Sequence, residues 1–91
     1  MKADNSHESL LKFPCQFPVK AMGKSGPELE SAIMEIVARH VPELSAGDVK
    51  FVASKKGTYT SITITIRAQS KQQLDNIYQD LTACEHVLYA L

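Results

Sequence analysis

The stretch Gly23-Lys24-Ser25-Gly26 is the strongest candidate for binding chemistry in this sequence. Glycine, lysine and serine before a helix are typical of the end of a phosphate-binding loop, where backbone N–H groups surround a phosphate. The complete motif requires a glycine at position 18, where this chain has proline. Nucleotide hydrolysis is therefore not predicted, but a carboxylate or phosphate remains a candidate ligand, beside the alternative of a plain strand-to-helix turn.

A second candidate lies at residues 56–59, which are lysine, glycine, threonine and tyrosine. A basic residue, a glycine and an aromatic residue begin one RNA-binding signature, in which rings on an open sheet stack against bases. The later aromatic positions of that signature are serine, threonine and isoleucine here. RNA binding is therefore kept as the alternative hypothesis, and the residues that would carry it are Lys55, Lys56, Tyr59 and Arg67.

Catalytic and metal-binding patterns are not evident in the sequence. His7, His40 and His86 form no i, i+4 pair and have no cysteine at ligand spacing. The carboxylates are scattered over the expected helices, and the glycine loop offers Lys24 where an acylphosphatase would need an arginine. We therefore expect no catalytic residue, no metal and no cofactor.

The composition indicates one small cytoplasmic domain. The 91 residues carry ten basic and ten acidic side chains, so no overall basic field favours nucleic acid. No apolar run approaches the roughly 18 residues of a membrane span, and the N-terminus lacks the apolar core of a signal peptide. Residues 1–9 are polar and are expected to form a disordered tail, and residues 10–91 a single domain. Cys15 and Cys84 are expected to be free thiols of a reducing compartment.

Alternating isoleucines indicate the strand around which this domain is organised. Isoleucine occupies positions 62, 64 and 66, so an extended chain would place these side chains on one face. Ser61, Thr63 and Thr65 would then line the other face. One apolar and one hydroxylated face predict a sheet that is covered on one side only.

Further strands are expected at about 16–22, 49–54 and 87–91, and helices begin near residues 26 and 70. The order is β-α-β-β-α-β. Right-handed crossovers then give a ferredoxin-like α+β sandwich, a four-stranded antiparallel sheet of order 4-1-3-2 with both helices on one face. This order puts the two cysteines at opposite ends of neighbouring strands, so no disulfide is expected.

Three further expectations concern the predicted strands and the hairpin between two of them. Pro18 cannot donate a ladder hydrogen bond, so it should face an unpaired side or a bulge. Alternation predicts that Val49, Phe51 and Ala53 point inward. Gly57 is expected to supply a positive φ in the hairpin.

Two capping boxes are predicted at the helix starts. Ser25 with Glu28 fits the first, and Gly26 is the alternative cap. Ser70 with Gln73 fits the second.

Two sequence blocks carry a family resemblance. Residues 10–23, L-x-K-F-P-C-Q-F-P-V-K-A-M-G, and residues 56–65, K-G-T-Y-T-S-I-T-I-T, resemble the YbeD-like family of small uncharacterised bacterial proteins. The resemblance implies a ferredoxin-like domain similar to the ACT-type regulatory domains of amino-acid enzymes, with no established activity. The recurring residues of the family fall at Phe13, Pro14, Phe17, Lys20, Gly23, Gly57, Tyr59 and Ser61.

The leading hypothesis is a non-catalytic regulatory or adaptor module. It would bind a small molecule or a protein partner through the open sheet face and the loop at residues 23–26. ACT-type domains bind amino acids near the corresponding loop between paired domains, so a homodimer is a further expectation. We expect Gly23→Val or Lys24→Ala to weaken binding and to leave the melting temperature little changed. The candidate ligand-binding residues are Lys20, Gly23, Lys24, Ser25, Gly26, Ser61, Thr63 and Thr65.

Overall fold

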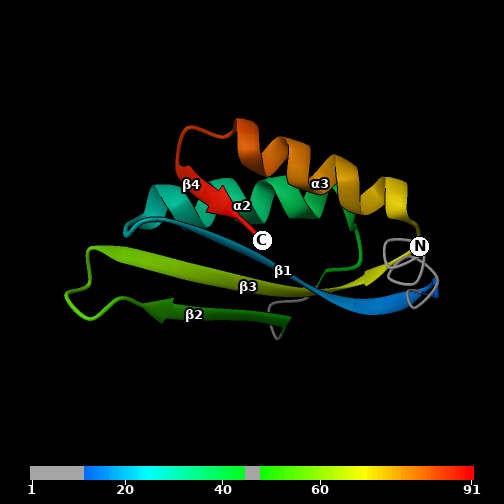
Figure 1. Ribbon diagram of the computed structural model, residues 1–91, viewed down its shortest axis with the longest axis horizontal. Helices are drawn as coiled ribbons and strands as arrows, with labels where there is room; N and C mark the ends of the chain where they lie inside the picture. Colours follow the sequence, from blue (N-terminus) through cyan, green and yellow to red (C-terminus); the bar gives the residue numbers. More distant parts are fainter. Residues whose placement is uncertain (1–11, 45–47) are drawn as a thin grey trace, which may run out of the picture.

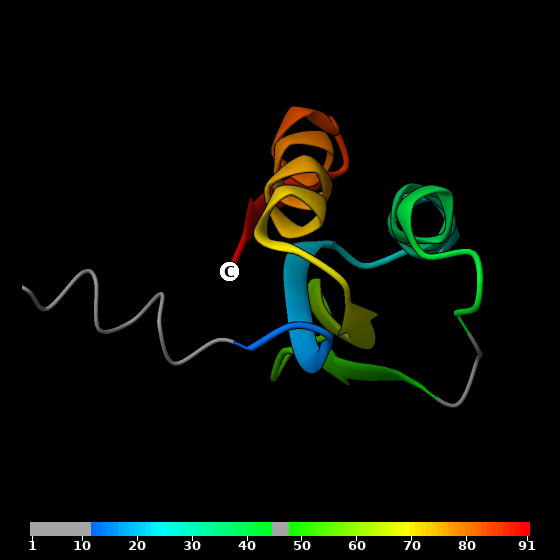
Figure 2. The same cartoon turned by 90° about the vertical axis from the view of Figure 1, so that its right-hand side faces the viewer.

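A four-stranded antiparallel sheet lies under two helices in the part of the chain that the computed structural model describes, residues 12–44 and 48–91 (Figures 1 and 2). The elements in chain order are β1 (Cys15–Lys24), α2 (Pro27–His40), β2 (Val49–Ala53), β3 (Tyr59–Ala68), α3 (Lys71–Ala83) and β4 (Val87–Ala90). The sheet order β2-β3-β1-β4 is the predicted order counted from the opposite edge. The ferredoxin-like architecture is therefore confirmed, while the predicted tail at residues 1–9 lies outside the described residues.

The isoleucine strand β3 and its partner β1 form the centre of the sheet. Their register runs from Cys15 opposite Ala68 to Lys24 opposite Tyr59, so β1 is longer at both ends than expected. The isoleucines of β3 are at most 2% exposed. They pack below the apolar faces of the helices, where the core includes Val19, Ala21, Leu29, Ile33, Val37, Ile77 and Leu81.

Strand β4 covers only part of the outer edge of β1. Its ladder contacts begin at Gly23 and Met22, and Lys20 exchanges backbone hydrogen bonds of 3.3 and 2.7 Å with Leu91. Backbone N–H and C=O groups alternate in direction along a strand, so the backbone of Pro18 faces the same side of β1 as that of Lys20. At Pro18 this side lies beyond the end of β4. The missing N–H of Pro18 therefore faces an unpaired side, as predicted.

Strand β2 corrects one expectation. Val49 and Phe51 stand opposite Ile64 and Ile62, which puts them on the helix side of the sheet, but Phe51 is 49% exposed. The predicted phase was right and the predicted burial of Phe51 and Ala53 was wrong. The physical reason is position, because β2 is an edge strand, and of its inward-facing residues Val49 packs against the core whereas Phe51 and Ala53 do not.

The helix starts differ from each other. Gly26, with φ of 149°, is the N-cap of α2, and no side chain caps that helix, so the predicted box of Ser25 with Glu28 does not form. The Ser70 hydroxyl accepts a hydrogen bond from the Gln73 N–H at 3.1 Å, which confirms the second cap. The Gln73 side chain accepts from the N–H of residue 69, one residue before the expected donor.

Polar contacts join the two helices to each other. Asp80 Oδ2 lies 2.6 Å from His40 Nε2 and 3.8 Å from an Arg39 guanidinium nitrogen. Gln73 also donates to the His40 carbonyl at 2.9 Å. These contacts connect α2 and α3, which also share the apolar core above the sheet.

Three further features complete the described chain. Cys15 and Cys84 are both free, as expected. The hairpin between β2 and β3 contains Gly57 with φ of 75°, which confirms the predicted positive φ. Neither α2 nor α3 has the length and apolar character needed to cross a bilayer.

Candidate functional site

The side of the sheet that faces away from the helices is called the open face here. Strand alternation and the cross-strand register determine which residues belong to it, because paired residues share a face. Buried Val19 and Ala21 point to the helices, so their neighbours Lys20 and Met22 point the other way. The open face consists of Gln16, Pro18, Lys20, Met22, Lys24, Lys50, Val52, Tyr59, Ser61, Thr63, Thr65, Arg67 and Tyr89.

A row of three paired residues at the middle of the open face places two lysines beside one threonine hydroxyl. Thr63 pairs with Lys20 on one side and with Lys50 on the other. Neighbouring strands lie about 4.8 Å apart, so the two lysines start from backbones about 10 Å apart. This spacing lets both ammonium groups reach one anionic group that hydrogen-bonds to the threonine.

A shallow hollow lies beside this row. Its volume is about 300 Å³, and its lining residues are Gln16, Asp48, Val49, Lys50, Thr63 and Thr65. Two of the predicted ligand-binding residues, Thr63 and Thr65, therefore share a concave surface. Lys20 and Ser61 lie on the same face without lining this hollow.

The glycine loop forms a second hollow at one end of β1. This hollow measures about 390 Å³ and is lined by Lys24, Ser25, Glu28, Leu29, Glu85, His86 and Leu88. Lysine and histidine side chains stand there beside two carboxylates. A ligand with both an amino group and a carboxylate would match this mixture of charges.

The loop is fixed by contacts with β3 and the segment before it. The Ser25 N–H donates to the Thr58 carbonyl at 2.9 Å, and the Ser25 and Thr60 hydroxyl oxygens lie 2.6 Å apart. The Ser25 hydroxyl therefore positions the loop rather than capping the helix. Gly26 contributes the backbone conformation at which the helix starts.

Gly23 has a packing function that the sequence did not reveal. A Cβ atom at this position would stand 2.2 Å from the His86 carbonyl oxygen and 2.7 Å from Leu29 Cδ1. Backbone and core side chain therefore occupy the space that any larger residue would need. The expectation that Gly23→Val changes the melting temperature little is wrong for this steric reason.

The two hollows are separate sites. The row of Lys24 and Tyr59 beside the loop lies six residues from the row that contains Thr65. At about 3.3 Å per residue, this separation is about 20 Å. A small metabolite can occupy one hollow but not both, whereas a protein partner can contact the whole open face.

The residues of the RNA alternative lie at both ends of the open face. Lys55, Lys56 and Tyr59 line a hollow of about 270 Å³ at the hairpin, and Tyr59 is 40% exposed. Arg67 lies eight residues farther along β3, about 27 Å away. The four residues therefore mark the ends of a long face and do not form one cluster.

Some residues of both hollows were not among the predicted site residues. Lys50, Asp48 and Gln16 were missed at the sheet hollow, and His86 with Glu85 was missed at the loop hollow. Correct pairing of β2 with β3 would have found Lys50, because the pairing puts it beside Thr63. In the described ranges, histidine, cysteine and carboxylate side chains form no group of three that could hold a metal ion.

Comparison with known proteins gives a family and a fold. A family model described as "Protein of unknown function (DUF493)" matches residues 8–91. A UPF0250 protein of Neisseria gonorrhoeae (strain ATCC 700825 / FA 1090) is 41% identical over 91 residues, all of both chains. One from Paraburkholderia phytofirmans (strain DSM 17436 / LMG 22146 / PsJN) is 47% identical over 76 residues, 84% of this chain and 85% of its own.

The solution structure of protein HP0495 from H. pylori has a similar fold. Its TM-score is 0.70 at 14% sequence identity, and the match covers 89% of this chain and 85% of that one. At this identity the likeness supports the fold alone.

Proposed function

The chain belongs to the DUF493 family, whose relatives are called UPF0250 proteins, and on that premise we propose that it is a non-catalytic regulatory or adaptor module that binds a partner on its open face. The family description assigns no activity, so the proposal rests on geometry. The observation that carries it is the row of Lys20, Thr63 and Lys50 beside the sheet hollow. Ammonium and hydroxyl groups on an uncovered sheet bind through charge and hydrogen bonds.

The loop hollow is the proposed small-molecule site. It lies at the end of β1, where ACT-type domains bind amino acids, and this analogy of position supports an amino acid or a similar zwitterion. Lys24 and the positive N-terminal end of the α2 dipole would face the carboxylate of the ligand. The side chain of Glu28 or Glu85 would face its amino group.

A cytoplasmic location and a homodimer belong to the same proposal. Two free, half-buried thiols support a reducing compartment. Strand β2 has a sheet neighbour on one side only, and an edge of this kind can pair with a second copy.

The first test is a thermal-shift screen of the full chain against amino acids, nucleotides and common metabolites, with the mass in solution measured alongside. A ligand at 100 times its dissociation constant stabilises a domain by about 2.7 kcal/mol, which is several degrees at this size. Lys24→Ala should weaken binding of a hit at the loop hollow. The matched control is Lys71→Ala, because Lys71 is an exposed lysine on α3.

The outcomes separate the parts of the proposal. A zwitterionic ligand whose binding depends on Lys24 supports the loop site. A hit that both variants bind equally well removes the loop from the site. A blank screen removes the small-molecule part and leaves the protein partner on the open face.

RNA binding is the second candidate, because exposed Tyr59 stands on the open face opposite Lys24. Filter binding in rising salt tests it, since phosphate contacts weaken linearly with the logarithm of salt concentration. Absence of binding at low salt would exclude this candidate.

A further inference from the structure

Charge is unevenly distributed between the two layers of this molecule. The four strands contain no aspartate or glutamate, but they carry Lys20, Lys24, Lys50 and Arg67. All four side chains are exposed on the open face. The formal net charge of zero therefore hides a cationic face.

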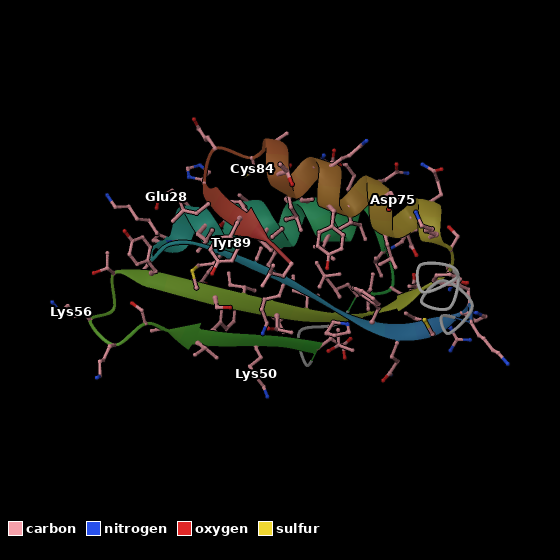
Figure 3. All side chains as sticks on the ribbon, in the orientation of Figure 1. Glu28, Lys50, Lys56, Asp75, Cys84 and Tyr89 are labelled. Carbon is pink, nitrogen blue, oxygen red and sulfur yellow. The ribbon has the colours of Figure 1, made fainter. Side chains whose placement is uncertain are left out.

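The acidic residues of the described chain lie on the helices and the connecting segments. Figure 3 shows this separation, because the labelled residues Glu28 and Asp75 lie on α2 and α3, while Lys50 and Lys56 lie at β2 and its hairpin. Asp48, directly before β2, is the acidic residue that lines the sheet hollow. A potential of one sign over a face attracts partners of the opposite sign and raises their association rate.

The cationic side chains form rows at a regular spacing. Lys24 stands opposite Tyr59, Lys20 opposite Thr63, and Arg67 opposite Gln16, so successive rows are four residues apart along both strands. Four residues of extended chain span about 13 Å. The three rows therefore cover about 27 Å along the open face.

An apolar row crosses the sheet between the first two cationic rows. It runs from Val52 through Ser61 and Met22 to Tyr89, and its outer members are 56% and 50% exposed. Apolar side chains of a protein partner can bury against Val52, Met22 and Tyr89, whereas a nucleic acid needs rings that stack between its phosphate contacts. The ring of this row, Tyr89, lies on the edge strand β4, whereas the centre of the face carries the hydroxyl and aliphatic groups of Ser61, Thr63 and Met22, which favours a protein.

We propose that the open face docks an acidic protein segment in an extended conformation. The inference rests on the proposed function above and names the partner class for its open-face site. In an extended chain, side chains four residues apart share a face, and so does the side chain midway between them. Carboxylates at that spacing would meet the cationic rows, and an apolar side chain midway between the first two would meet the apolar row.

The experiment is an NMR titration of the full chain with two synthetic nine-residue peptides of equal composition. The first peptide has glutamate at its first, fifth and ninth positions and leucine at its third, with serine elsewhere. The second has glutamate at its first, fourth and eighth positions, which splits the carboxylates between two faces. An eight-nucleotide oligouridylate is titrated at the same salt concentration.

The variants test the surface. Lys20→Glu with Lys50→Glu reverses the central cationic row, and Lys71→Glu is a single charge reversal on α3, outside the open face. We expect the first peptide to shift amides of β1, β2 and β3 and to bind about tenfold tighter than the second. The paired change should weaken it about tenfold or more, and the Lys71 change less than about twofold.

Three results would overturn the inference. Tighter binding of the oligouridylate than of either peptide would assign the face to nucleic acid. Equal effects of the paired change and the Lys71 change would show unspecific attraction. If neither peptide shifted an open-face amide, the acidic segment would be excluded, while a zwitterion bound at the loop hollow would still support the proposed function.

Discussion

Replacing Gly23 by alanine should destabilise the fold far more than an ordinary surface substitution. The new Cβ would lie 2.2 Å from the His86 carbonyl oxygen, whereas ordinary contacts begin at 3.4 Å. The backbone at His86 must therefore retreat by about 1.2 Å, and Leu29 Cδ1, at 2.7 Å, by about 0.7 Å. The carbonyl cannot rotate away as a flexible side chain would, so β4 has to move with it.

The expected cost follows from overpacking. Forcing one extra methyl group into a packed region costs about 1–3 kcal/mol. For a domain of this size, each kcal/mol lowers the melting temperature by about 4–8 °C, so Gly23→Ala should lower it by about 4–24 °C. Thermal and urea unfolding of the full chain measure this loss.

Gly57 provides the matched control. An added Cβ there meets no atom within 4 Å, although φ is 75°. Asparagine tolerates the left-handed region, so Gly57→Asn should lower stability by less than about 1 kcal/mol. A Gly23→Ala protein that melts within about 2 °C of the parent would refute the steric argument. Lys24→Ala, at an exposed position, is then the appropriate variant for binding at the loop.

Three further predictions concern the helices. Ser70→Ala removes the cap of α3 and should cost about 1 kcal/mol in urea unfolding, with Ser70→Asp restoring most of it. A double-mutant cycle of His40→Ala and Asp80→Ala should give a coupling energy of about 0.5–1 kcal/mol; zero coupling would mean that the 2.6 Å contact adds no stability. Burial raises the pKa of the Tyr78 phenol, and a backbone hydrogen bond at Lys20 partly offsets this shift. Above about pH 10 the Tyr78 phenol therefore ionises in the unfolded chain before it does so in the folded one, and the free energy of unfolding falls as the pH rises. Tyr78→Phe removes this phenol together with its hydrogen bond to the Leu91 carbonyl. The free energy of unfolding of this variant should therefore fall less at alkaline pH than that of the parent.

Much of the fold could be predicted because local and periodic signals agreed. The isoleucine alternation, the Ser70 cap and the turn at Gly57 each depend on neighbouring residues only. The exposure of Phe51 could not be predicted in this way. Alternation determines which face a side chain occupies, but coverage of that face depends on how far the helices reach across the sheet.

The candidate site was predictable in part for the same reason. Thr63 and Thr65 follow directly from strand alternation and line the sheet hollow. Finding Lys50 requires the pairing of β2 with β3. Finding His86 requires its contact with Gly23, which lies far from it in the sequence. The Gly23 position shows the limit most clearly, because a glycine in a loop motif and a glycine in tight packing are identical in sequence.

The pairing of β1 with β3 has a consequence for the order in which the chain folds. Paired residues are separated by 35 positions at Lys24 and Tyr59, and by 53 positions at Cys15 and Ala68. Contacts of such long range close slowly, whereas the β2–β3 hairpin is local. Synthesis at about 5–20 residues per second adds the partner strand several seconds after β1, so we expect the β1–β3 ladder to form after the β2–β3 hairpin.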